Sequence, residues 1–82
     1  MNDAEFEDKV LQIIAGVTNL DAGTINRNTL LVADLGIDSA SALVLLVELE
    51  DIFDVTLSDR AAAGMRTVGD ILDYLRAIAK SA

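Results

Sequence analysis

The sequence predicts an all-α fold, a small four-helix bundle of three longer helices and one short third helix, with a long first loop. Apolar residues recur at helical spacing in three segments, near the beginning, the middle and the end of the chain. A serine followed by a short run of good helix formers separates the second segment from the third. No proline interrupts any of them. With 82 residues, we expect one domain spanning 1–82, with a core of limited size.

The first helix is predicted to run from near Glu5 to about Gly16 or Val17, with Asn2 or Asp3 as its cap. Acidic residues fill its first turn, where the helix dipole favours negative charge. We interpret its apolar face as core and not as a binding surface. That face consists of Phe6, Val10, Ile13 and Val17, with Ile14 on its edge.

The connection over 18–38 is long for a small helical domain. Glycines and asparagines make it prone to turns, yet apolar residues occur throughout it. We expect these apolar side chains to pin the loop across the bundle, with room for one brief helical turn. They are Leu20, Ile25, Leu30, Leu31 and Leu35.

The central helix is predicted to begin after Asp38, whose carboxylate can cap it, so that Ser39 is its first or second residue. A hydroxyl there is exposed at the positive end of the helix, where an attached phosphate is favoured. The core face of this helix comprises Ala42, Leu45, Leu46, Leu49 and Phe53.

The opposite face of the central helix is unusually apolar for a surface. It carries Ala40, Val44, Val47 and Asp51. Acids gather instead near the C-terminal end, where the helix dipole disfavours them, at Glu48, Glu50, Asp51 and Asp54. Helix stability does not account for this arrangement, whereas a partner protein would.

A short third helix is predicted after Ser58, ended by Gly64 and tethered to the core by Leu57 and Met65. The last helix begins at Thr67, with Asp70 in a capping-box-like position, and ends near Lys80. Its inward stripe is Val68, Ile71, Leu72 and Leu75, extended by Ile78 or Ala79.

Composition excludes several classes of function. The net charge is −8, and residues 28–59 hold seven acids and no base, which repels nucleic acid and anionic membranes and attracts basic proteins. Without cysteine or histidine, the chain lacks thiolate chemistry, the usual soft metal ligands and a base to activate a hydroxyl, so we expect neither an enzyme nor a metal site. A calcium loop opened by Asp34 fails because its terminal glutamate would fall at Leu45, and only a loose surface cation site stays open as an alternative.

The location of the protein is also predicted from the sequence. The acidic N-terminus does not have the pattern of a signal peptide. The longest apolar run, Ala42 to Val47, is too short to span a membrane. We therefore expect a cytoplasmic protein.

The segment Asp34-Leu35-Gly36-Ile37-Asp38-Ser39, followed by a leucine-rich acidic helix, resembles the modification site of the acyl carrier protein family. The likeness extends over nearly the whole chain. Two positions depart from the family pattern: Ala40 stands where the family has leucine, and Val44 where an acid is common.

The resemblance implies a 4′-phosphopantetheine arm joined to Ser39 through a phosphodiester by a phosphopantetheinyl transferase, with Asp38 as the motif aspartate. The thiol of the arm would hold acyl groups as thioesters. Basic partner enzymes would load and process these groups on a monomeric carrier. Space beneath Ala42, Leu46 and Met65, left by small Ala62 and Ala63, would shelter an apolar chain. The implied docking residues are Ala40, Val44, Val47, Glu48, Glu50 and Asp51.

The pathway stays open between fatty-acid, polyketide and aminoacyl or peptidyl carriers. The departures at Ala40 and Val44 favour a polyketide or other specialised pathway. A hypothesis of another class is a helical interaction domain that has no prosthetic group. Under that hypothesis, Val44 and Val47 form a homodimer seam and Ser39 is only a cap.

Overall fold

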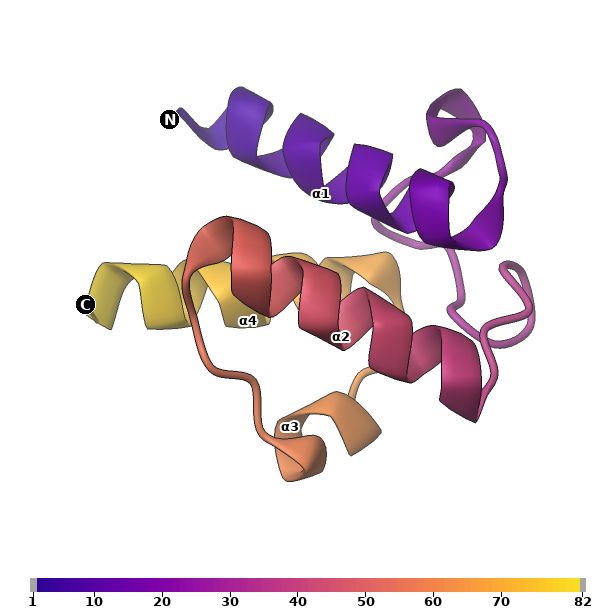
Figure 1. The fold of residues 1–82 in the computed structure, drawn as a ribbon. Helices are drawn as coiled ribbons and strands as arrows, with labels where there is room; N and C mark the ends of the chain where they lie inside the picture. Colours follow the sequence, from indigo (N-terminus) through magenta and orange to yellow (C-terminus); the bar gives the residue numbers. More distant parts are fainter. Residues whose placement is uncertain (1, 82) are drawn as a thin grey trace.

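The computed structural model describes the backbone of residues 2–81 and the side chains of residues 2–78. Its elements are α1 (Asp3–Thr18), a 3₁₀ turn η1 (Ala22–Thr24), α2 (Ser39–Phe53), α3 (Asp59–Ala63) and α4 (Val68–Ser81). In Figure 1, α1 crosses the top of the molecule, α2 lies in front of α4, and short α3 lies below them. The predicted all-α bundle, with a short third helix and a long first loop, is confirmed.

Helix α1 is longer at both ends than the sequence predicted. It begins at Asp3 because the Asn2 side chain caps it, accepting from the Glu5 N–H at 2.8 Å. It continues to Thr18, whose hydroxyl donates to the Ile14 carbonyl at 2.8 Å. Asn19 then ends the helix in the left-handed conformation, with φ at 59°.

The core lies between α1, α2 and α4, closed on one side by the first loop. Ile14, predicted on the edge of the apolar face of α1, is fully buried, while Phe6 and Val17, predicted within that face, are half-buried. The predicted inward stripe of α4 is buried over Val68, Ile71, Leu72 and Leu75. At one end of the bundle the Phe6 and Phe53 rings pack 5.3 Å apart, and the Arg76 guanidinium lies 5.7 Å from the Phe6 ring centre.

The first loop is pinned to the core by only some of the residues predicted to do so. Ile25 and Leu31 are buried, but Leu20 and Leu30 are exposed, so the prediction was wrong for these two. Leu30 forms an isolated antiparallel bridge with Thr67. Neighbouring residues of extended backbone face opposite sides, so burying Leu31 turns Leu30 outward.

The same loop caps the start of α4 with its backbone. The Val68 N–H donates to the Thr29 carbonyl at 3.0 Å, and the Gly69 N–H to the Arg27 carbonyl at 2.9 Å. These bonds satisfy two of the free N–H groups at the helix end. A Cβ atom on Gly69 would lie 3.1 Å from the Arg27 oxygen, which is why glycine suits this close approach.

The predicted caps of the last two helices are confirmed. The Ser58 hydroxyl accepts from the Ala61 N–H at 3.1 Å, and Gly64 ends α3. The Asp70 carboxylate accepts from the Arg66 and Thr67 N–H groups, at 2.8 and 3.1 Å. The predicted roles of the Ala79 and Lys80 side chains lie outside the described residues.

Candidate functional site

Ser39 is the first residue of α2, and its side chain is exposed. The preceding Asp38 caps the helix as predicted: its carboxylate accepts from the Ser41 N–H at 2.8 Å and from the Ser41 hydroxyl at 3.0 Å. These two hydrogen bonds, the backbone one above all, lower the pKa of Asp38 below its ordinary value. The Asp38 carboxylate therefore caps the N-terminal end of α2, and the Ser39 side chain beside it is exposed to solvent.

A tight turn before Asp38 places Ser39 at the surface. The Asp34 carboxylate accepts from the Leu30 N–H at 2.8 Å. Gly36 adopts the left-handed region with φ at 68°, which favours glycine. Ile37 then returns to the core, with its N–H donating to the Leu31 carbonyl at 3.0 Å. Two buried side chains, Leu31 and Ile37, thus anchor the turn on which Ser39 depends.

An open groove of about 370 Å³ begins beside Ser39, bounded by Asp38 and Val32. It leads toward an apolar cavity of about 50 Å³ between α2, α3 and α4, whose inner end is formed by Leu49 and Ile71. Groove and cavity adjoin each other, since they share five lining residues: Leu31, Ile37, Ala42, Ala62 and Met65.

The space expected beneath Ala42, Leu46 and Met65 is therefore present. Of the two alanines expected to leave room for it, only Ala62 lines the groove and the cavity. Ala63 is exposed, so its predicted role was wrong. Neighbouring helical residues point about 100° apart, and on α3 this turns Ala63 to solvent while Ala62 faces the cavity.

A family model described as the phosphopantetheine attachment site matches residues 8–75 of this chain. An acyl carrier protein of Syntrophobacter fumaroxidans is 40% identical over 75 residues, which are 92% of this chain and 93% of that relative. This chain belongs to the acyl carrier protein family. Acyl carrier proteins are carriers and not enzymes, and their cofactor is a covalently attached 4′-phosphopantetheine.

Solved structures of acyl carrier proteins share the fold. One, from Mycobacterium tuberculosis, is 37% identical with a TM-score of 0.84. The match covers 89% of this chain and 97% of the Mycobacterium chain. Another, from Enterococcus faecalis, is 32% identical with a TM-score of 0.78. The match covers 94% of this chain and 98% of the Enterococcus chain. The residues that line the groove all fall within the part of the chain that the family model matches.

Helix α2 of this carrier exposes most of the predicted docking residues. Ala40, Val44, Val47, Glu48 and Asp51 all have exposed side chains. Glu50 differs, because it is half-buried and its carboxylate accepts from the Leu57 N–H at 3.0 Å. This bond connects α2 to the segment before α3. Glu50 and Leu57 are seven residues apart, and no local sequence pattern predicts a bond over that separation.

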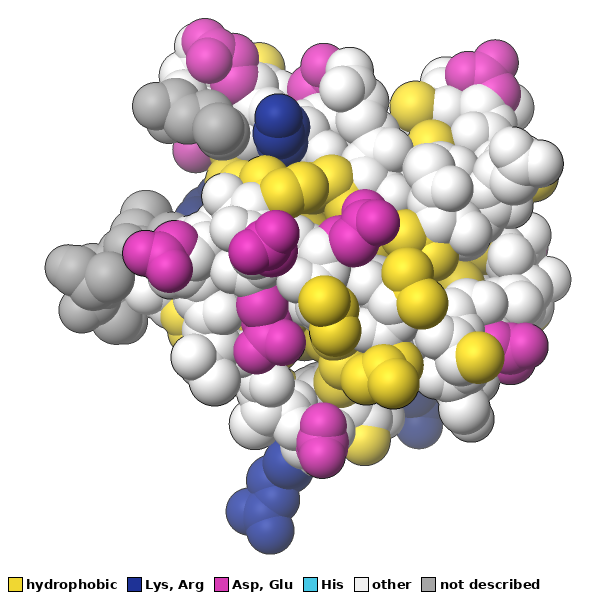
Figure 2. Space-filling view, in the orientation of Figure 1, with side chains coloured by type: hydrophobic (Ala, Val, Ile, Leu, Met, Phe, Trp, Pro, Cys, Tyr) yellow, Lys and Arg dark blue, Asp and Glu magenta, His cyan; other side chains and the backbone are white. Residues whose placement is uncertain are grey.

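Sequence reasoning missed three exposed apolar residues near the docking face. They are Val32, Leu43 and Ile52. Leu43 could have been found from its spacing, since it follows Ser39 by one helical turn. Figure 2 shows apolar side chains gathered over α2, with acidic ones toward its C-terminal end.

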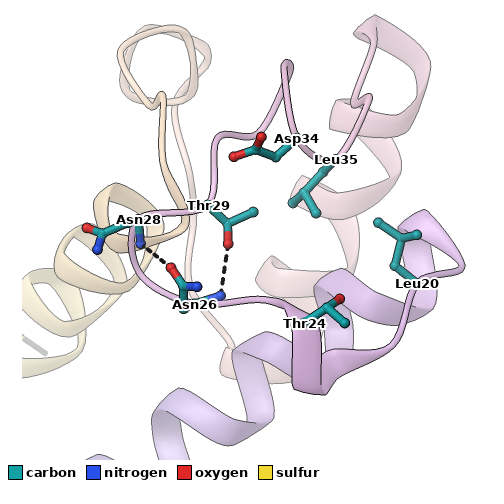
Figure 3. A pocket seen from close by; sticks show the side chains of 7 residues that line it. All are labelled: Leu20, Thr24, Asn26, Asn28, Thr29, Asp34 and Leu35. Carbon is teal, nitrogen blue, oxygen red and sulfur yellow. Dashed lines mark hydrogen bonds between the residues drawn. The ribbon is translucent and has the colours of Figure 1, made fainter.

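A second concavity, of about 510 Å³, lies within the first loop and is lined partly by Asn26, Thr29 and Asp34 (Figure 3). Its polar groups bond to one another: the Thr29 hydroxyl accepts from the Asn26 N–H at 2.9 Å, and the Asn26 amide oxygen from the Asn28 N–H at 2.8 Å. Ser39 is not among its lining residues. We therefore interpret it as part of the loop's own structure.

Two further searches covered the described part of the chain. No group of three or more Asp, Glu, His or Cys side chains there is placed to hold a metal ion. No helix among the described residues is long and apolar enough to cross a membrane.

Proposed function

We propose that Ser39 is the residue to which the phosphopantetheine arm is attached. The observation that carries this proposal is its position, exposed on the first residue of a helix capped by Asp38, at the mouth of the groove. The free N–H groups and the dipole at this helix end favour a phosphodiester. When attached, the arm supplies a terminal thiol for acyl thioesters, which the cysteine-free chain does not have.

Groove and cavity support a role in holding the apolar part of a short acyl chain. Their shared lining includes the apolar side chains of Leu31, Ile37 and Met65. At about 50 Å³ the cavity is smaller than the roughly 150 Å³ known to hold benzene. A longer chain therefore requires Met65, a flexible side chain, to move aside.

We propose a polyketide or other specialised pathway as the setting, with an acyl group as cargo and a monomeric carrier. The support is chemical: α2 presents Ala40 and Val44 where the family commonly has a leucine and an acid, so its docking surface differs in shape and charge. Fatty-acid synthesis and aminoacyl transfer are the alternatives. The intact mass of the loaded protein from its native host distinguishes the three, because each cargo adds a different mass.

The attachment site is tested by incubating the apo protein with coenzyme A, Mg²⁺ and a broad-specificity phosphopantetheinyl transferase. Intact mass should increase by one phosphopantetheinyl group, and Ser39→Ala should abolish the increase. Ser41→Ala is the matched control, because it removes a hydroxyl from the same helix turn but keeps the backbone N–H from which Asp38 accepts, so modification should stay complete. Modification that persists in Ser39→Ala would refute the assignment. If the wild-type protein gains no mass, the alternative hypothesis holds, in which the chain is a helical interaction domain without a prosthetic group.

A further inference from the structure

Met65 lies where the open groove meets the apolar cavity. Its half-buried side chain lines both of them, the groove of about 370 Å³ and the cavity of about 50 Å³. The chain has two methionines, and Met65 is the only one among the described side chains. A small reagent that enters the groove from solvent therefore reaches a side chain that also forms part of the cavity wall.

Backbone hydrogen bonds hold the segment around Met65 in place. The Met65 N–H donates to the Ala62 carbonyl at 3.1 Å, and the next carbonyl, of Arg66, accepts from the Leu31 N–H at 2.9 Å. The first bond joins Met65 to α3, and the second joins the segment to the first loop. A methionine side chain itself rotates about three bonds. A chemical change at the sulfur should therefore move the side chain and leave the backbone in place.

We propose that Met65 is a reversible oxidation site, at which hydrogen peroxide turns the thioether into a sulfoxide and weakens the hold of the cavity on an acyl chain. In this step the sulfur attacks one peroxide oxygen, and an S–O bond forms as the O–O bond breaks. The second oxygen leaves as water, which takes both protons. The sulfur is oxidised by two electrons and the peroxide is reduced by two. A thiol-dependent methionine sulfoxide reductase reverses the change.

The cavity offers no partner to a sulfoxide oxygen. None of the described side chains that line it has a hydrogen-bond donor, and its inner part is formed by Leu46, Leu49 and Ile71. A sulfoxide oxygen that stayed there would be buried without a hydrogen bond, which is unfavourable. The oxidised side chain therefore turns into the groove, where water is available, and part of the apolar wall is lost. An aliphatic residue in place of Met65 would not respond to peroxide, so the response depends on the sulfur.

The oxidation itself is tested on the apo protein and does not require the arm. Dilute hydrogen peroxide should add one oxygen atom to Met65, located by peptide mass spectrometry. The native protein should react at no less than about one tenth of the rate measured in urea, where the side chain is fully exposed. Methionine sulfoxide reductase with dithiothreitol should remove the oxygen. Met65→Leu is the matched control, because it keeps a similar apolar volume without the sulfur. A native rate below that limit would overturn the proposal.

The effect on the cargo rests on the proposed attachment at Ser39. A hexanoyl thioester is formed on the arm, where it also shields the thiol, and its hydrolysis is followed by intact mass after the peroxide has been removed. Oxidation should accelerate hydrolysis about tenfold, because an unpartnered polar group disfavours the closed apolar wall. Met65→Gln should accelerate hydrolysis without peroxide, and Met65→Leu should be insensitive to peroxide. Circular dichroism should show all variants folded.

Two results would contradict the proposed effect of oxidation. One is an equal rate of hydrolysis in oxidised and reduced wild type. The other is acceleration by peroxide in Met65→Leu, which would place the cause outside Met65. A wild type that gains no arm would instead refute the attachment at Ser39, and the oxidation of Met65 in the apo protein would stand without it.

Discussion

Two aspartates cap the beginnings of two helices. Asp38 precedes α2 and accepts from the Ser41 N–H of its first turn. Asp70 lies in the first turn of α4 and accepts from the N–H groups of Arg66 and Thr67, which precede the helix. Those donors lower the pKa of both carboxyls, through the Ser41 N–H for Asp38 and the Arg66 N–H for Asp70. The orientation of Ser39 and the docking of the first loop on α4 therefore depend on ionised caps.

This linkage predicts loss of stability in acid. Because folding lowers both pKa values, the contribution of the caps is complete above the ordinary aspartate pKa of about 3.9 and is lost as pH falls through the lower folded values. Thermal midpoints measured by circular dichroism should therefore decline steeply below about pH 4. The double variant Asp38→Asn, Asp70→Asn keeps an acceptor that does not titrate, so its decline should be shallower.

Asp51→Asn is the control for that experiment, because Asp51 is an exposed aspartate in the interior of α2 and caps no helix. It should retain the wild-type pH dependence. Equal slopes for the double variant and wild type would show that the caps do not govern acid stability. Capping at Asp38 and Asp70 was predictable from sequence because both bonds span three or four residues. The Glu50–Leu57 bond was not, since it requires the chain to turn back after α2.

At the scale of a helix, α2 combines two surfaces of opposite role. Leu45 and Leu49 are buried, with Leu49 only 1% exposed, while Val44 and Val47 point to solvent. The 3.6-residue period was sufficient to predict this division. It did not predict the outward turn of Leu30, which depends on a bridge to Thr67, 37 residues later in the chain. The helical period thus predicts which side chains of a helix are buried. The burial of loop side chains depends instead on contacts between segments that are distant in the sequence.

The two faces of α2 should respond differently to substitution. Leu49→Ala should lower the free energy of unfolding by about 2–5 kcal/mol, because it leaves a cavity among buried side chains of the core. Val44→Asp should change it by no more than about 0.5 kcal/mol, as is usual for exposed positions, and should impair acyl transfer by a partner enzyme. Urea unfolding followed by circular dichroism measures both. If Val44→Asp unfolds the domain, the exposed face of α2 is misassigned.

At the scale of the whole molecule, charge opposes the fold. The chain has 14 acids against 6 bases, a net charge of −8 on one small body. Among the described side chains, two bases are engaged in ion pairs, Arg27 with Asp73 at 2.6 Å and Arg76 with Asp3 at 3.8 Å. Such exposed pairs contribute little to stability. Repulsion among the remaining acids is therefore the larger electrostatic effect.

Salt should accordingly stabilise this carrier protein. Raising ionic strength shortens the range of repulsion, from about 30 Å at 0.01 M to about 10 Å at 0.1 M. Salt also screens the exposed ion pairs, but this costs little because they contribute little to stability. A gain of about 1 kcal/mol corresponds to a rise of roughly 4–8 °C in Tm for a domain of this size. Differential scanning calorimetry in NaCl measures that rise.

Magnesium chloride at matched ionic strength distinguishes screening from binding. In the part of the chain that the structure describes, no three or more Asp, Glu, His or Cys side chains are placed to hold a metal ion, so both salts should raise Tm by similar amounts. A much larger rise in magnesium would point to a specific cation site that the geometry does not predict. A Tm that stays flat or falls in both salts would mean that the exposed ion pairs outweigh self-repulsion, contrary to the excess of acids along α2 and its flanking loops.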